Sequence, residues 1–152
     1  MRKVTDENSC SLLRSLREYL LCCSLLIPGA FGLHRLDSLF PAGALFSGEE
    51  KELARYLDED RLYRFDFLIC ARESHTACTA DALQTSGRLD ALARWLRQQN
   101  RTGFLPFLTH GRQPLSLLPA GQPFTSDSDE DRINWQLRCS LIYSQSALNG
   151  PL

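Results

Sequence analysis

The chain has 152 residues and a mass of 17.2 kDa, which is enough for one domain with a modest core. Hydrophobic residues make up 43% and charged residues 23%, so the chain is globular and neither disordered nor fibrous. The formal net charge of -1 and the spread of arginines along the chain argue against a nucleic-acid partner, which would require a basic stripe.

The N-terminal part combines a polar stretch, residues 1–18, with an uncharged apolar run at 19–33. A transmembrane helix needs about 20 apolar residues, and Pro28 interrupts this run. Small residues at Ala30 and Gly32 suit a signal peptidase, which would cut after Gly32. We therefore predict that residues 1–32 are a signal peptide or N-terminal membrane segment. The alternative is a buried N-terminal helix in a cytosolic protein.

The first elements after this segment are predicted to be a short edge strand at 36–44 and a helix at Ser47–Glu59. Ser47 and Glu50 fit a capping box, with acids in the first helical turn. Leu53 and Leu57 would form the buried stripe of this helix.

The middle of the chain predicts a strand followed by a helix. In Tyr63–Cys70, alternate residues are aromatic or aliphatic, which indicates a strand with one buried face. A polar loop, residues 71–80, leads into a helix at Asp81–Gln99 that buries Leu92 and Leu96 and ends near Gly103.

The last third predicts two more strands, Phe104–Thr109 and Ile133–Tyr143, separated by a long loop at 111–131 that ends in acidic residues. Residues 147–152 are expected to be a tail. The order is β-α-β-α-β-β, which predicts an α/β sandwich: a mixed sheet with two helices packed on one face.

The cysteines and histidines do not predict a metal site. Cys70, His75, Cys78 and His110 are zinc-compatible residue types, but their spacing matches no familiar zinc motif. Without the N-terminal segment only Cys70, Cys78 and Cys139 remain, an odd number that implies no closed disulfide framework. One disulfide among these three stays open, and we expect no cofactor.

The most informative spacing is that of Glu73 and Arg88. Glu73 follows the predicted strand Tyr63–Cys70, and Arg88 opens the apolar part of the next helix. This order can hold a carboxylate and a guanidinium close together where the strand of one strand–helix unit leads into its helix. Such a pair suits a small zwitterionic ligand better than bond-breaking chemistry. The alternative is an ordinary surface salt bridge.

The sequence resembles the OmpA-like (OmpA/MotB C-terminal) peptidoglycan-binding domain over residues 33–146. LFPAGALFSGEE is similar to the opening of that family, THGRQP to the turn after its third strand, and INWQL to its last strand. The central motif of the family is matched position by position at Glu73 for its Asp, Asp81 for its Asn, Thr85 for its Ser, Arg88 for its Arg, and Asn134 in the last strand.

The resemblance implies a non-catalytic periplasmic domain, with or without membrane attachment through residues 19–33, that binds the diaminopimelate-containing stem peptide of peptidoglycan. Glu73 and Arg88 would hold the amine and the carboxylate, with Asp81, Thr85 and Asn134 around them. The alternative is an interaction module on the same fold, without peptidoglycan binding, in a secretion, conjugation or motor-type envelope assembly.

Overall fold

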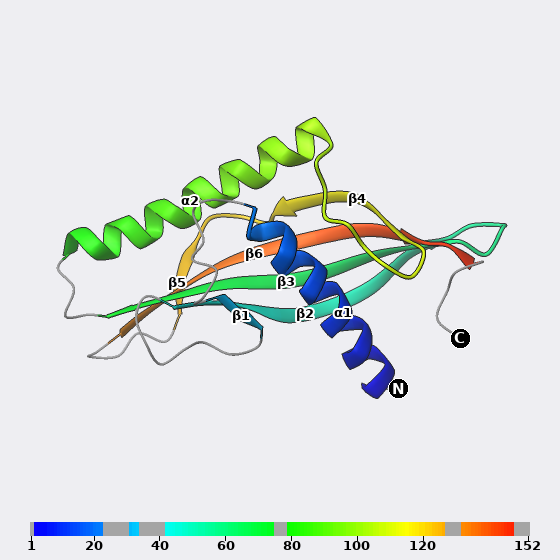
Figure 1. The fold of residues 1–152 in the computed structure, drawn as a ribbon, viewed down its shortest axis with the longest axis horizontal. Helices are drawn as coiled ribbons and strands as arrows, with labels where there is room; N and C mark the ends of the chain where they lie inside the picture. The colour runs from blue at the N-terminus through cyan, green and yellow to red at the C-terminus, as the bar shows by residue number, and fades with distance from the viewer. Residues whose placement is uncertain (1, 23–30, 34–41, 75–78, 127–131, 148–152) are drawn as a thin grey trace.

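The computed structural model describes the backbone of residues 2–22, 31–33, 42–74, 79–126 and 132–147, and the side chains of residues 11–22, 43–71, 89–125 and 134–147. Two helices lie on one face of a mixed sheet (Figure 1). In chain order the elements are α1 (Arg2–Leu20), β1 (Phe31–Leu33), β2 (Ala42–Arg55), β3 (Arg61–Ser74), α2 (Thr79–Thr102), β4 (Arg112–Pro119), β5 (Phe124–Ser126) and β6 (Arg132–Gln145).

The strands are arranged in the order β1-β2-β3-β6-β4, and β5 pairs with β6 beyond the end of β4. The β1–β2 pair is parallel and all the others are antiparallel. The predicted mixed sheet with two helices on one face is thus confirmed in its coarse form. The described elements, however, follow the order α-β-β-β-α-β-β-β instead of β-α-β-α-β-β.

The centre of the sheet is the β3–β6 pair, which stays in register from Arg61 opposite Gln145 to Ser74 opposite Arg132. Alternate residues on both strands are aromatic or aliphatic, so one face of the pair is apolar along most of its length. The strands predicted at Tyr63–Cys70 and Ile133–Tyr143 are confirmed, and both extend further at each end.

A single hydrophobic core joins both helices to this apolar face of the sheet. Its residues are Leu12, Leu13, Leu16, Tyr19 and Leu20 of α1, Leu89, Leu92, Ala93 and Leu96 of α2, Leu108 of the following loop, and Leu45, Phe65, Phe67, Ile69, Leu117, Leu137, Cys139, Leu141 and Tyr143 of the sheet.

Helix α1 belongs to this core because its apolar residues are spaced at the helical period. The Tyr19 ring lies 5.4 Å from the rings of both Trp95 and Phe104, and its hydroxyl donates to the Phe104 carbonyl oxygen. Removal of residues 1–32 would take four fully buried leucines out of the core. Cleavage of this segment stays a prediction.

Helix α2 contains the predicted helix Asp81–Gln99 and ends where the sequence indicated. Gly103 has a φ of +83°, a left-handed conformation that glycine adopts readily. The Phe104 N–H donates to the Gln99 carbonyl oxygen at 3.0 Å, the bond of a Schellman motif. The predicted burial of Leu92 and Leu96 is confirmed.

The helix predicted at Ser47–Glu59 is wrong, because this segment forms most of β2 and the turn that follows. Ser47 pairs with Phe67 and Glu50 with Phe65, so the apparent capping box is a one-residue bulge in a β-ladder. A Cβ on Gly48 would lie 2.8 Å from the Asp66 carbonyl oxygen, so the bulge requires glycine. Pairing with β3 overrides the helix propensity of the Glu- and Lys-rich stretch.

The predicted positions of strand and loop after α2 are also wrong. Residues 104–109 are irregular, and the predicted loop contains β4 and β5. Pro114 is tolerated because β4 is an edge strand, and a bulge between Pro114 and Ser116 leaves Leu115 exposed. Residues 36–41 of the predicted edge strand lie outside the described residues, and β2 begins at Ala42.

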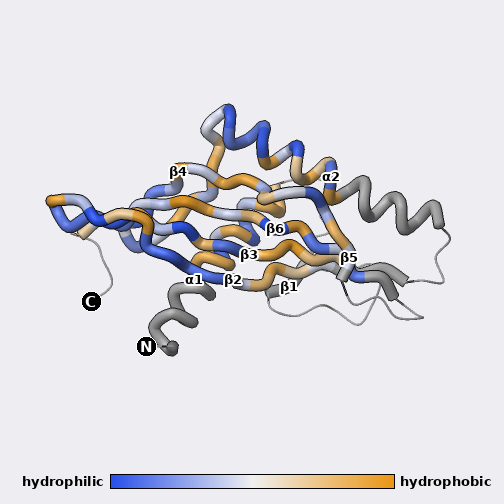
Figure 2. The backbone as a smooth tube through the Cα atoms, turned by 180° about the vertical axis from the view of Figure 1, so that it is seen from behind, coloured by the Kyte–Doolittle hydropathy of each residue, from blue (hydrophilic) through white to orange (hydrophobic). Residues whose placement is uncertain are grey.

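Neither of the two described helices covers the other face of the sheet (Figure 2). Ser140 Oγ donates to Asp66 Oδ1 at 2.7 Å, and Arg64 Nε lies 3.4 Å from the same oxygen. The Arg138 guanidinium lies over the Phe124 ring, 5.3 Å from its centroid. An antiparallel sheet with such a mixed face can remain in contact with water.

Candidate interaction surface

The predicted ligand site lies where β3 is followed by α2. The backbone of Glu73 is near the end of β3 and pairs with Ile133, and Arg88 is in α2 beside the buried Leu89. Glu73 therefore lies within β3, so the predicted start of the polar loop at residue 71 is wrong, whereas Arg88 lies in the helix as predicted. The side chains of Glu73 and Arg88 lie outside the described ones, so their approach to one another stays a prediction.

The other three predicted site residues lie on the same elements. Asp81 and Thr85 are in the first half of α2, with side chains outside the described ones. Asn134 is half-buried on β6, where its backbone is opposite Arg72 of β3. It is therefore one register position away from the partner of Glu73. A role of Asn134 in ligand binding stays a prediction.

The two buried thiols among the described residues lack the thiolate form that a reactive cysteine needs. Cys22, Cys70 and Cys139 are free, and the last two are buried. Burial raises the pKa of Cys70 to about 11 and raises that of Cys139 as well, so both thiols are protonated at neutral pH. Cys78 and His75 lie outside the described residues, and among those described no three His, Cys, Asp or Glu residues group to hold a metal ion.

A different surface stands out at the opposite end of the sheet, where β2 and β3 form a hairpin that projects beyond the core (Figure 1). The Tyr56 N–H donates to the Asp60 carbonyl oxygen at 2.8 Å, and the Glu59 N–H donates to the Tyr56 carbonyl oxygen at 3.0 Å. Glu59 has a φ of 72°, a left-handed conformation in which non-glycine residues are strained. The turn at 56–60 is therefore well defined.

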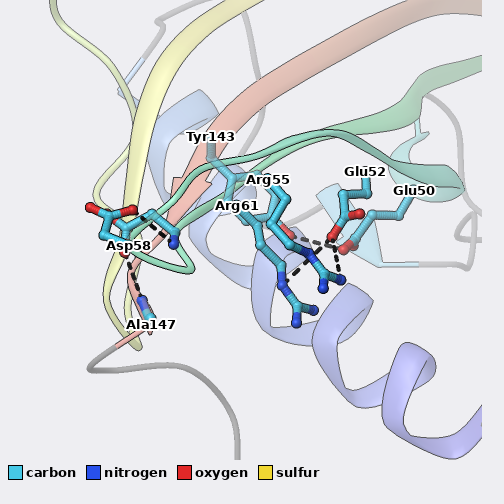
Figure 3. Close-up of polar contacts among 8 residues, drawn as sticks. Glu50, Glu52, Arg55, Asp58, Arg61, Tyr143 and Ala147 are labelled. Atoms are coloured by element: carbon cyan, nitrogen blue, oxygen red, sulfur yellow. Dashed lines mark hydrogen bonds and ion pairs between the residues drawn. The ribbon is translucent and has the colours of Figure 1, made fainter.

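The arginines of the hairpin point back along the strands to an acid (Figure 3). Arg55 and Arg61 both lie 3.6 Å from Glu52 Oε1. A side-chain hydrogen bond with Tyr63 is the main cause that raises the pKa of Arg61, which stays charged at neutral pH. Next to this pair, the Tyr143 hydroxyl donates to Glu50 at 3.0 Å.

Unlike Glu52, the two aspartates at the end of the hairpin accept hydrogen bonds from backbone N–H groups. Asp58 accepts the Asp60 N–H, and Asp60 accepts the Ala147 N–H, which ties the turn to the end of β6 (Figure 3). Among the residues that the structure describes, ion pairs involve Glu52 and Asp66, and none involves Asp58 or Glu59. The end of the hairpin is thus acidic.

The same turn also exposes apolar side chains. Leu57 has a relative exposure of 105%, so it contacts almost nothing in the chain, and Tyr56 is 51% exposed. Figure 2 shows this apolar end of the hairpin, flanked by hydrophilic strands. We call residues 56–59 the hairpin tip. A single exposed Leu is common. Here a fully exposed Leu follows an exposed Tyr, a residue type that is enriched at interfaces, on a projecting turn.

A basic surface lies on α2. Arg94, Arg97 and Arg101 are exposed, and their spacing places them on one face of the helix. Asp90 lies at the N-terminal end of this face and is half-buried. In the described part of the chain no ion pair involves these three arginines. We call Arg94, Arg97 and Arg101 the arginine face.

Neither surface was predicted from the sequence. The hairpin tip was assigned to a helix, although Asp58 and Asp60 just before an alternating strand are a turn signal. Arginines are spread along the whole chain, but the spacing of Arg94 and Arg97 within the predicted helix Asp81–Gln99 places these two on one face.

A search of protein-family models and of curated proteins found no match for the chain. In the described parts of the chain, neither helix is both long and apolar enough to cross a membrane.

Proposed function

We propose that this chain is a non-catalytic interaction module that contacts another protein through its hairpin tip. The observation that carries the proposal is the full exposure of Leu57 at the end of a projecting, well-defined turn. This corresponds to the second of the two functions considered from the sequence. Membership of an envelope assembly remains part of the same proposal.

The stability of the fold gives no reason for this arrangement. Leu57 adds nothing to the core, and a polar residue at its position would avoid an apolar group in water. Burial of such a side chain against a partner contributes about 1.5–3 kcal/mol. Contact with another protein therefore accounts for Leu57 and Tyr56 where folding does not.

Site-specific photo-cross-linking in cells tests the proposal. A benzoylphenylalanine at position 57 should give a covalent protein adduct after irradiation, because the side chain would lie in an interface. The same group at position 125, an exposed position on β5, serves as the matched control. If position 57 gives no more adduct than position 125, the proposal fails.

Peptidoglycan binding is the second candidate. It is favoured by the backbone order that carries Glu73 at the end of β3 and Arg88 in the helix that follows. The carboxylate would pair with an ammonium group and the guanidinium with a carboxylate of the stem peptide. In this case the protein would act in the periplasm, with or without membrane attachment through residues 19–33.

A pull-down with insoluble sacculi tests this candidate with the full chain. Arg88→Ala should lose binding, whereas Arg14→Ala, at an exposed position of α1 outside both surfaces, should keep it. Glu73→Asp, which restores the acid of the OmpA-like motif, should bind at least as well as the wild type. Wild-type protein that ignores sacculi would rule this candidate out.

A further inference from the structure

We infer that the protein contacted by the hairpin tip is a second copy of this chain, which receives the tip on its arginine face. This inference rests on the proposed function, because it names the partner of the same surface. The hairpin tip and the arginine face are both exposed and carry opposite charge, so two copies of one sequence are complementary.

The charges of the chain are segregated, although they nearly cancel in total. From Glu49 to Arg61 the chain carries six acids and three bases, and Arg55 and Arg61 both lie beside Glu52. Glu59 also acts on Arg61, but the excess of acids still gives the end of the hairpin a negative potential. Around the exposed Leu57 this makes an apolar contact with an acidic border.

The receiving surface has the opposite sign. From Ala91 to Gly103 the chain carries three arginines and no acid, and all three arginines are exposed. Helix α2 covers the β4 side of the sheet, where the chain also exposes Phe107 and Leu115. Exposed arginines on α2 and exposed apolar groups on the loop and strand that follow it fit a partner that is apolar at its centre and acidic at its border.

The two surfaces cannot meet within one molecule. The tip connects β2 and β3 at one end of the sheet, whereas α2 lies over β6 and β4 on its far side (Figure 1). Contact between them must join two copies head to tail. Such contacts can continue from copy to copy, until a ring closes or a filament forms.

A charge-swap experiment with the full chain tests this inference. One variant carries Asp58→Lys and Glu59→Lys, and the other carries Arg94→Glu and Arg97→Glu. Sedimentation should show the wild type as an oligomer. Its association constant should fall at least tenfold at about 0.5 M salt. Each variant alone should sediment as the 17.2 kDa monomer, because like charges then face each other.

A mixture of the two variants should recover the oligomer. In the mixture a lysine tip can meet a glutamate face and an acidic tip can meet an arginine face, so every contact is again complementary. Arg14→Glu, at an exposed position of α1, should associate like the wild type. Circular dichroism of all variants should match the wild type, and so should thermal unfolding at about 0.5 M salt and low protein concentration, where the wild type is dissociated.

The outcomes separate this inference from the function on which it rests. Monomeric wild-type protein together with a strong cross-link from position 57 to a different protein would overturn the inference and leave the interaction module standing. Monomeric protein with no cross-link would overturn both. An oligomer that neither variant disrupts would place the contact elsewhere and overturn the inference.

Discussion

The β3–β6 pair and the hairpin tip are both parts of the same sheet, but their apolar residues are in opposite environments. Along the β3–β6 pair, alternate residues such as Phe65, Phe67 and Leu141 are buried under the two helices. At the tip, Tyr56 and Leu57 extend past the helices and are exposed. Apolar residues in the first region stabilise the fold, whereas those in the second contribute to stability only if a partner covers them.

Among substitutions that test this comparison, the largest loss of stability is expected in the centre of the sheet. Phe65→Ala should lower the free energy of unfolding by about 3–5 kcal/mol, because it removes a fully buried ring and leaves a cavity. Leu57→Ala should change it by no more than about 0.5 kcal/mol. Urea denaturation measures both. Similar losses in the two variants would contradict the division between the regions.

The next largest effect concerns α1, which extends the buried region. Leu16→Ala should cost about 2–5 kcal/mol, since Leu16 is fully buried between the helix and the sheet. Arg14→Ala, on the exposed side of the same helix, is the control and should be nearly neutral. Stable, cooperative unfolding of a chain that begins at Leu33 would show that α1 is not part of the folding unit.

A smaller effect is expected at the border between the two regions, where Tyr143 of the core hydrogen-bonds to Glu50 of the hairpin. Tyr143→Phe keeps the ring and removes the hydroxyl, so it should cost about 1–2 kcal/mol in urea denaturation. Tyr56→Phe, at the exposed tip, should cost almost nothing. Equal costs would mean that the Tyr143–Glu50 bond does not connect the hairpin to the core.

The elements of the packed core were predicted better from the sequence than the segment that forms the projecting hairpin. Tyr63–Cys70, Asp81–Gln99 and Ile133–Tyr143 were predicted well because one face of each is packed, which imposes a clear period on the residues. Ser47–Glu59 was read as a helix because its Glu and Lys residues have high helix propensity, and its pairing with β3 depends on residues that follow it in the chain.

The site was predictable to a smaller extent. The positions of Glu73 and Arg88 on consecutive elements followed from local patterns, but whether two side chains meet depends on how the helix crosses the sheet. The hairpin tip and the arginine face become visible only when exposure is known. Exposure depends on tertiary packing, which no single segment of the sequence encodes.

The smallest effect is expected within the tip itself. Glu59→Gly should stabilise the fold by about 0.5 kcal/mol, because it relieves the strain of a left-handed non-glycine residue, although glycine loses more entropy on folding. Glu49→Gly, at an exposed position in β2 without positive φ, should be destabilising. Thermal unfolding of the two variants in parallel provides the measurement, and the reverse order would contradict the turn geometry.

The most direct test of the division between core and tip is a side-by-side measurement of association and stability on Leu57→Asp. At about 0.5 M salt and low protein concentration, where the wild type is dissociated, Asp at the exposed position should leave the midpoint of thermal unfolding unchanged. At low salt it should reduce the sedimenting species to 17.2 kDa, while the wild type remains heavier at the same concentration. A lower unfolding midpoint with unchanged association would contradict the account, because Leu57 would then act in folding and not in binding.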